Sequence, residues 1–532
     1  MNPPPTVFQR RIVIGAVICV AAFALVGARL IGVTLFTPGS GAAKHGAVSD
    51  VTRADIIDRN GELVARDLPT DDLYAHPHLV ADPRLAARKL AAATGTDERR
   101  LAQLFAGKHA TVLVARQLQP EVRAKIKRLG LPGLEYQPDS KRYYPDGSMA
   151  AQVVGVTDPD GNGVSGLELG LDSKLRGIRP GNPVQTSLDM RVQFILAHEA
   201  AASMEEFKAR AAGGLVMDVH TGEILALVSL PDFDPNTRAF AASESTRNIM
   251  VQDIYELGSV FKIFSFAMAL ENHTIPDLDE QIPIGNGYKI GKYTIHEAER
   301  MPATLAVRDV LAQSSNIGTA EIALRSGAAR QHAFLTRMGL LSPIKSELPE
   351  AARPLYPSNW GPIETATIGF GHGISVSPLA FVAAAAAVVN GGRRVEPTFL
   401  KRSADARGEQ LVSPATSATM RELLRYVVTN GTGKKADAPG YDVGGKTGSA
   451  EKAGPHGYQA HKLVTSFCGV FPIDDPRYLV FVLLDEPHGT KATSGFALAG
   501  YTAAPLAGHV IARIAPLLGV LMKPVTVAKE NS

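Results

Sequence analysis

Apolar residues in the C-terminal half of the chain form short, nearly continuous runs that are separated by polar turns. The runs LVMDV (215–219) and ILALVSL (224–230) predict two buried strands joined by a tight turn. GGKTGSA (444–450), TSFCGVFPI (465–473) and RYLVFVLLDEP (477–487) predict three more strands, the last two joined at a turn that contains Pro476. The pattern therefore predicts a sheet in this half of the chain.

Helical spacing of apolar residues surrounds these strands. The helices that it predicts lie at about 189–208, in the apolar run that follows Gly258, at 304–312, at 378–389 and at 501–518. The helix at 378–389 has the clearest ends, because Ser377 is a candidate N-cap and Pro378 occupies the first turn. Helices flanking a mostly antiparallel sheet are the expected architecture, an α+β domain.

The first half of the chain has a different pattern. Residues 37–50 read as a Gly/Ala/Ser-rich linker, and Asn60-Gly61 predicts a hairpin between Ile56 and Ala65. Helical spacing covers 84–105, and residues 141–177 are turn-rich and strand-like. No acid/base cluster of catalytic type occurs here, so we expect a structural or partner-binding domain.

The N-terminus carries the longest apolar run. Arg10 and Arg11 precede Ile12–Phe36, which is long enough to span a bilayer of about 30 Å as a helix, with the N-terminus inside. Arg29 interrupts the run and can reach the outer interface. The alternative is a cleaved signal peptide, but the run exceeds the usual length of one. Either way, nearly all of the protein lies outside the cytoplasm.

The length of 532 residues and these pattern changes divide the chain into parts. We expect a multidomain α+β protein made of a cytoplasmic tail (1–11), a transmembrane helix (12–36), a pedestal domain (37–188), a catalytic domain (189–525) and a tail (526–532).

Composition and charge exclude several function classes. With 45% hydrophobic and 20% charged residues the chain is globular, and a net charge of +3 gives no argument for nucleic-acid binding. Cys19 and Cys468 lie in different predicted environments, so no disulfide is expected. His296, His372, His461 and His488 lack metal-ligand spacing and read as surface or structural residues, and we predict neither a metal nor a cofactor.

Two further patterns suggest sites that their context does not support. GYDVGGKT (440–447) matches a phosphate-binding loop, but neither an apolar strand before it nor a helix after it is predicted. Asp158, Asp160 and Asn162 resemble the start of a calcium loop, but the position of the required glutamate holds Leu169, so a polar turn is the better interpretation.

Three short motifs carry the candidate chemistry. S-x-x-K occurs at Ser259, Ser342 and Ser449, whereas S-x-N with a free middle position occurs once, at Ser314, and K-T-G occurs once, at Lys446. Only Ser259 precedes both of the other motifs. The order S-x-x-K, S-x-N, K-T-G is typical of penicillin-binding proteins and class A β-lactamases.

The residue types suit acyl transfer through a serine. On a helix Ser259 and Lys262 share a face, so a neutral Lys262 amine can take the proton of the serine hydroxyl. Burial and a nearby second cation, Lys446, would keep that amine neutral. Ser314 can relay the proton to the leaving group, and Asn316 can hold Lys262 and bind the substrate backbone.

The strand that carries K-T-G is expected to bind substrate. We predict Thr447, Gly448 and Ser449 as substrate-binding residues: the two hydroxyls and Lys446 suit a terminal carboxylate. The backbone N–H groups of Ser259 and Ser449 can form an oxyanion hole.

From about residue 53 to 505 the sequence resembles the class B penicillin-binding proteins. The resemblance includes RADIIDRNGELVA, RYYPDGSMAAQVVG, GLELGLDSKLRG, MDVHTGEILALVSLPDFDPN, GFGHGISVSPL, GTGKKA ahead of K-T-G, and SFCGVFP. Leu257, Val260 and Ser449 stand where the family often has Pro, Thr and Thr, and Ser449 keeps the hydroxyl. No glycosyltransferase-type E-D-x-x-F segment occurs.

The resemblance implies a peptidoglycan D,D-transpeptidase in the inner membrane, with its catalytic domain in the periplasm. Its substrates would be stem peptides ending in D-Ala-D-Ala, and β-lactams would acylate Ser259. The chain looks most like the septal, cell-division (penicillin-binding protein 3) type, which works beside a SEDS-family glycosyltransferase and other division proteins. The alternatives are an elongation-type enzyme, a hydrolysing carboxypeptidase or β-lactamase, a β-lactam sensor and a division scaffold.

Overall fold

The computed structural model describes residues 53–178, 181–237, 244–454 and 457–524. The predicted transmembrane helix and the two predicted tails lie outside these residues. Within the part that is described, no helix combines the length and the apolar character that a membrane span requires.

The front domain is built on a sheet around the long strand β2 (Leu63–Ala75). β2 pairs antiparallel with β1 (Ile56–Ile57), β3 (Val112–Leu118) and β4 (Leu134–Tyr143), and β1 pairs parallel with β5 (Val184–Gln185). The predicted hairpin is confirmed, since Ile57 lies opposite Leu63 and Ile56 opposite Ala65. The helices of this domain are α2 (Pro83–Thr94), α3 (Glu98–Ala106), α4 (Pro120–Arg128), α5 (Ala151–Val154), α6 (Gly166–Gly170) and α7 (Asp172–Gly177).

The helical pattern at 84–105 forms two helices rather than one. Gly95 follows α2 with a left-handed φ of 74°, a conformation that a glycine adopts at little cost. The side chain of Asp97 then accepts the backbone N–H of Arg99 and so caps α3. Gly95 therefore ends one helix and Asp97 starts the next, although the helical spacing of apolar residues continues through this segment.

The base of the front domain packs into the catalytic domain. Ile56, Val64 and Leu167 belong to the same buried cluster as Leu215 and Phe481 of the large sheet. Hydrogen bonds cross the junction as well: the Gln152 side chain donates to the carbonyl of Pro231, and the N–H of Gly166 donates to Glu350. The front domain is thus joined to the catalytic domain through a continuous core.

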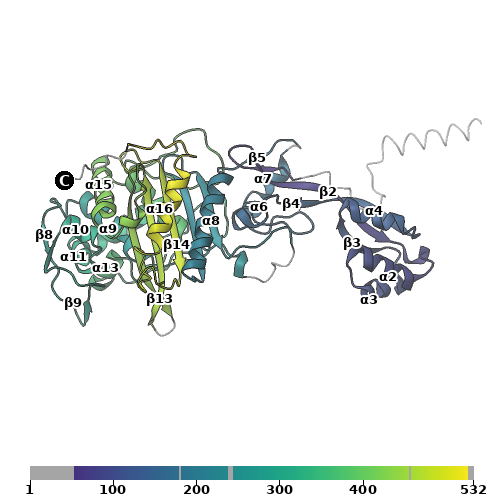
Figure 1. The fold of residues 1–532 in the computed structure, drawn as a ribbon, viewed down its shortest axis with the longest axis horizontal. Coiled ribbons are helices and arrows are strands. Elements are labelled where there is room, and N and C mark those ends of the chain that lie inside the picture. The colour runs from purple at the N-terminus through teal and green to yellow at the C-terminus, as the bar shows by residue number, and fades with distance from the viewer. Residues whose placement is uncertain (1–52, 179–180, 238–243, 455–456, 525–532) are drawn as a thin grey trace, which may run out of the picture. The chain divides into compact units, whose positions relative to one another are not determined.

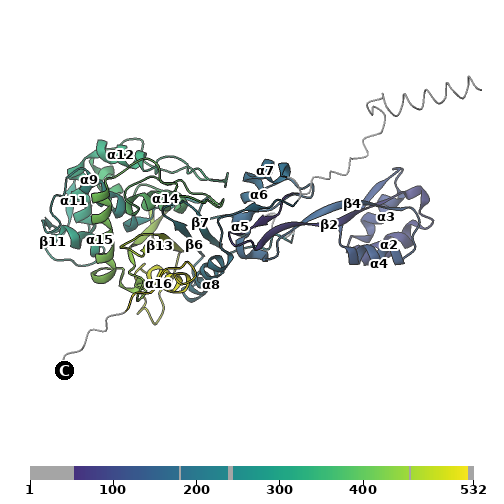
Figure 2. The same cartoon turned by 90° about the horizontal axis from the view of Figure 1, so that it is seen from above.

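The catalytic domain contains a five-stranded antiparallel sheet in the order β12–β13–β14–β6–β7 (Figures 1 and 2). Its strands are β6 (Ala211–Asp218), β7 (Ile224–Leu230), β12 (Gly444–Gly454), β13 (Gly457–Phe471) and β14 (Tyr478–Asp485). Each of the five predicted strands corresponds to one of these strands. The prediction of an antiparallel sheet is therefore confirmed.

Helices cover both faces of this sheet because alternate strand residues point to opposite sides. Val216 and Val480 pack with α8 (Met190–Glu206) and α16 (Ala503–Ile514) in one core. Leu215 and Phe481 face the other way and pack with α9 (Lys262–Glu271), α14 (Pro378–Val389) and α15 (Pro414–Asn430). The predicted cap of α14 is confirmed, since Ser377 Oγ accepts the N–H of Ala380.

Two predicted helices of the catalytic domain differ from the structure. Residues 304–306 form a short strand, β11 (Thr304–Ala306), paired with β8 (Gln281–Pro283), and helix α10 (Val307–Ala312) begins only after it. This strand pairing outweighs local helical spacing. The last helix is shorter than predicted at both ends. The remaining elements are β9 (Tyr288–Ile290), β10 (Tyr293–Ile295), α11 (Asn316–Ser326), α12 (Ala328–Arg337) and α13 (Pro362–Gly369).

Candidate active site

Ser259 lies in a single 3₁₀ turn, Gly258–Phe261, that continues directly into α9. Gly258 has a φ of 59°, which reverses the chain just before the serine. Ser259 is half-buried and lines a cavity of about 360 Å³. Lys262 begins α9 and is fully buried. The predicted arrangement, a serine at a helix start with a lysine one turn later, is present.

Glycines let the nucleophile turn lie directly against neighbouring backbone. A Cβ on Gly258 would stand 2.6 Å from the carbonyl oxygen of Ser449. A Cβ on Gly448 would overlap the Leu257 carbonyl and lie 2.8 Å from Ser466 Oγ, and one on Gly371 would overlap the Gly258 carbonyl. Strand β12 and the loop after α13 therefore hold the serine in place through close backbone contacts.

Lys262 is held by the S-x-N turn. Its Nζ donates to the Ser314 carbonyl at 2.6 Å, to Asn316 Oδ1 at 2.9 Å and to Ser314 Oγ at 3.2 Å. Burial lowers the pKa of the Lys262 amine well below 10.5, the charge of Lys446 lowers this pKa further, and the carboxylate of Glu297 opposes both effects. The environment thus favours a neutral amine.

Ser314 stands between the two lysines in a strained conformation. Its φ of 63° lies in the left-handed region, which is rare for a residue with a side chain and is common at functional sites. Its hydroxyl accepts a hydrogen bond from Lys446 Nζ at 2.9 Å as well as the one from Lys262. Burial lowers the pKa of Lys446 to about 7. Ser314 Oγ therefore connects two amines whose pKa values are both lowered by burial.

The K-T-G strand β12 forms one wall of the cavity. Thr447 and Ser449 line it, whereas Lys446 is fully buried beneath it. Thr447 Oγ1 lies 2.6 Å from Thr432 Oγ1, and Ser449 Oγ accepts the N–H of Ala499 at 3.0 Å. Both hydroxyls thus have partners and fixed positions, and both can still contact a substrate. Gly448 has no side chain, and this allows the strand to lie against the turn that carries Ser259.

The cavity has further walls that the sequence did not indicate. His372 was predicted to be a surface or structural residue, but it lines this cavity beside Ser259. Burial and the charge of Lys262 lower the pKa of His372 to about 4, so it is neutral. Its Nδ1 lies 3.8 Å from Glu256, whose carboxylate accepts the Tyr458 hydroxyl. Tyr501, Glu299 and Lys435 also line the cavity.

Glu297 is the other residue that was missed. Its carboxylate accepts hydrogen bonds from Ser315 Oγ and from the N–H groups of Asn316 and Ile317. It comes from the loop between β10 and β11, in the segment HEAER, which carries no motif. Only the fold brings it to the start of α11, so no sequence signal pointed to it.

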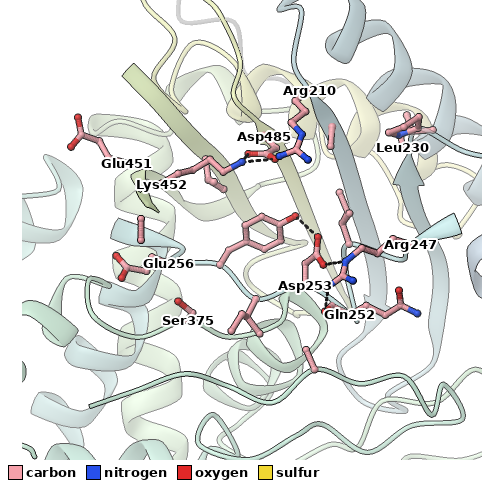
Figure 3. Close-up of a pocket in the computed structure, with 18 residues that line it drawn as sticks. Arg210, Leu230, Arg247, Gln252, Asp253, Glu256, Ser375, Glu451, Lys452 and Asp485 are labelled. Carbon is pink, nitrogen blue, oxygen red and sulfur yellow. Dashed lines mark hydrogen bonds and ion pairs between the residues drawn. The ribbon is translucent and has the colours of Figure 1, made fainter. Parts of the chain in front are cut away.

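A larger cavity, of about 830 Å³, lies elsewhere in the catalytic domain (Figure 3). It runs across one end of the large sheet, where Lys452 is paired with Asp485, and along the segment 252–256 that leads to Ser259. Arg247 and Asp253 form a second ion pair in its wall. None of the predicted site residues lines it, so the smaller cavity is the candidate active site.

The two misleading patterns are explained by the fold. Residues 444–454 form strand β12, so the helix that a phosphate-binding loop needs after Thr447 is replaced by a strand. Asp158 Oδ1 accepts the N–H groups of Asp160 and Asn162, which confirms the predicted polar turn.

The site combines the parts that serine acyl transfer needs. A half-buried serine lies on the turn that begins at Gly258, a lysine with a lowered pKa follows one turn later, and a serine bridges that lysine to a second one. A strand edge and two hydroxyls face the same cavity. Such a set can activate a hydroxyl, shuttle its proton and bind a carboxylate.

Comparisons with known proteins agree with this chemistry. Residues 212–507 match the family model described as "Penicillin binding protein transpeptidase domain", and residues 48–192 match "Penicillin-binding Protein dimerisation domain". A probable peptidoglycan D,D-transpeptidase FtsI of Caulobacter vibrioides is 40% identical over 90% of this chain and 84% of its own length. The peptidoglycan D,D-transpeptidase FtsI of Escherichia coli is 28% identical over 90% of this chain and 86% of its own.

Solved structures give the same result. Penicillin binding protein 3 from Mycobacterium tuberculosis, complexed with aztreonam, superposes with a TM-score of 0.70 and 26% identity, covering 90% of this chain and 98% of that one. Its complex with ampicillin superposes with a TM-score of 0.70 at 25% identity over the same shares of the two chains. With a dimerisation domain ahead of a transpeptidase domain, the chain belongs to the class B penicillin-binding proteins.

Proposed function

We propose that this protein is a peptidoglycan D,D-transpeptidase that cross-links stem peptides during septal cell-wall synthesis and that β-lactams inhibit. The observation that carries the proposal is the position of Lys262. Its amine is fully buried one turn after Ser259, is held by Ser314 and Asn316, and has a lowered pKa. A neutral amine in that place is the base that a serine nucleophile requires.

In the acylation step Ser259 Oγ attacks the carbonyl of the penultimate D-Ala, and Lys262 takes the hydroxyl proton. The oxyanion is stabilised by the N–H groups of Ser259 and Ser449. Ser314, which accepts hydrogen bonds from both lysines, passes a proton to the departing amine of the terminal D-Ala. The peptide bond breaks and an ester to Ser259 remains.

In the second step an amine of a neighbouring stem peptide attacks this ester. The amine loses a proton to the same relay, the peptide cross-link forms, and the proton returns to Ser259 Oγ. Lys446, Thr447 and Ser449 bind the terminal carboxylate of the donor peptide, and β-lactams enter by mimicking the same D-Ala-D-Ala end. Gly448 lets the strand approach the nucleophile turn.

The cellular setting is part of the proposal. The apolar run 12–36 anchors the chain in the inner membrane, with the catalytic domain in the periplasm. The front domain serves as a pedestal that binds a SEDS-family glycosyltransferase and other division proteins. Two relatives carry the FtsI name, which favours the septal over the elongation type.

Labelling with a fluorescent penicillin tests the assignment of the nucleophile. We expect Ser259→Ala to abolish labelling, because only the serine oxygen can form the acyl bond. Ser342→Ala, which changes a serine in another S-x-x-K match, is the matched control and should label like the wild type. If Ser259→Ala is still labelled, the assignment of Ser259 as the nucleophile is wrong.

Product analysis separates transpeptidation from hydrolysis. Donor peptide with an added amine acceptor should give cross-linked product, whereas a carboxypeptidase would release mainly hydrolysed peptide. A growth test addresses the sensor and scaffold alternatives, since a chain carrying Ser259→Ala should fail to support division when the wild type is depleted.

A further inference from the structure

Glu297 accepts three hydrogen bonds at the start of α11. Its Oε1 accepts Ser315 Oγ at 2.5 Å and the N–H of Ile317 at 3.0 Å, and its Oε2 accepts the N–H of Asn316 at 2.8 Å. Free N–H groups at a helix start carry positive character, so a carboxylate is the natural acceptor for them. Glu297 thus caps the helix from a loop that is remote in sequence.

The same contacts connect Glu297 to Lys262. Asn316 Oδ1 accepts from Lys262 Nζ at 2.9 Å, and the backbone N–H of that asparagine is bound by Glu297. Ser315 Oγ, held by Glu297, also accepts the N–H of Gly318 and fixes the turn on its other side. The position of Asn316, and with it the position of the Lys262 amine, depends on the Glu297 carboxylate.

Glu297 differs from a neutral helix cap because its negative charge acts on Lys262. Lys446 faces Lys262 from β12, His372 faces it from the loop after α13, and Glu297 faces it from the loop before β11. The charge of Lys446 disfavours a charge on Lys262, His372 is neutral, and Glu297 contributes the opposing negative charge. Glu299, Lys434 and Lys435 are the other charged residues that line the cavity.

We propose that Glu297 is a positioning residue for Lys262, which it acts on through Asn316 and through its charge, and that it sets the acid limit of Ser259 acylation. This rests on the proposed role of Lys262 as the base. The carboxylate holds the turn that holds the lysine, and its charge counters that of Lys446.

The test is the acylation rate of the detergent-solubilised full chain by a fluorescent penicillin, measured from pH 4 to 9. We expect Glu297→Gln to lower the maximal rate about 10- to 100-fold, because an amide accepts fewer of the hydrogen bonds that the carboxylate accepts. The acid limb of the profile should also move to lower pH, because loss of the negative charge makes the Lys262 amine easier to deprotonate.

Two further variants separate charge from capping. Ser315→Ala weakens the same turn without removing a charge, so its rate should fall while its acid limb stays in place. Glu297→Asp keeps the charge, so its acid limb should lie near that of the wild type. If Glu297→Gln fails to fold, Glu297→Asp still tests the positioning role, because its shorter side chain weakens the hydrogen bonds to the turn and should lower the maximal rate. A wild-type rate in Glu297→Asp would overturn that role.

The outcomes distinguish this inference from the proposed function. If the acid limb does not move in Glu297→Gln and Ser259 is still the labelled residue, the role of Glu297 is refuted. The proposed transpeptidase function is then unaffected. A limb that moves equally in Ser315→Ala also overturns the role of Glu297, since the turn alone would then be responsible. Labelling that persists in Ser259→Ala would instead refute the nucleophile itself.

Discussion

At the scale of single residues, the site depends on two buried lysines. Burying a charged amine costs free energy. Lys262 and Lys446 are both fully buried, and burial is the largest cause of the lowered pKa of each. In the proposed mechanism the two have different tasks, because a base must be neutral whereas a carboxylate ligand is best charged. The common partner, Ser314, allows one proton to be shared between them.

The pKa of Lys446 leads to a prediction about pH. Because burial lowers this pKa to about 7, the charge is present below that pH and is lost as the pH rises through it. We expect acylation by a penicillin to decline above about pH 7, by up to about tenfold per pH unit. The rate of acylation measured against pH checks this.

The methyl ester of the same penicillin is the control, because it lacks the carboxylate that Lys446 would bind. Its slower acylation should show no such decline. An equal decline for acid and ester would contradict carboxylate binding by Lys446.

Five predicted catalytic residues meet at the site, because their types and chain order are visible in sequence: Ser259, Lys262, Ser314, Asn316 and Lys446. Glu297 and His372 could not be predicted. Their side chains reach the site from a loop and from a turn after α13, and only tertiary packing places them there.

At the scale of elements, the site depends on how closely β12 approaches the turn before α9. Four strands of the large sheet could be predicted because each contains a distinct apolar run, whereas β12, GGKTGSAEKAG, contains none. The strand at 304–306 could not be, because its extended state is set by pairing with β8, far away in the sequence. The split between α2 and α3 follows from signals at Gly95 and Asp97 that were present in the sequence.

Gly448→Ala tests the contact between strand and turn. The added Cβ would overlap the carbonyl of Leu257, two residues before the nucleophile, and would lie 2.9 Å from Val260 Cγ1. We expect the acylation rate to fall about 100-fold, since a displacement of about 1 Å at a nucleophile has that effect. The rate constant for penicillin labelling measures it.

Gly177→Ala is the matched control, because a Cβ there meets no atom within 4 Å and the glycine has no left-handed φ. Its labelling rate should equal that of the wild type. A Gly448→Ala enzyme that labels at the normal rate would show that the close approach is not required.

At the scale of the whole molecule, the base of the pedestal is locked by a buried charge network. Glu168 is completely buried and pairs with Arg53 at 2.8 Å and with Arg142 at 2.7 Å. Arg53 also binds Asp172, and Arg142 binds Asp67. The network ties the first described residues to β4 and α6, next to the core that the two domains share.

Glu168→Ala should destabilise the protein by about 3–5 kcal/mol, because it leaves two buried arginines without their main partner. Denaturant unfolding of the protein, followed by fluorescence, measures the change in the free energy of unfolding. Asp55→Ala removes the partner of the exposed Arg66 in the same sheet and should cost no more than about 1 kcal/mol. Equal losses for the two variants would contradict a special role for the buried network.

The backbone contacts of Gly258, Gly371 and Gly448 limit how the enzyme can evolve resistance to β-lactams. No side chain fits at these positions. A substitution there that slows the reaction of Ser259 with a β-lactam would therefore also slow its reaction with the cell-wall substrate. Tolerated changes must arise on the rim of the cavity instead, at exposed or half-buried positions such as Glu299, Lys435 and Tyr501. Inhibitors that make their contacts with Thr447 and Ser449, on the strand that these glycines bring against the serine turn, would therefore be harder to escape than those that depend on the rim.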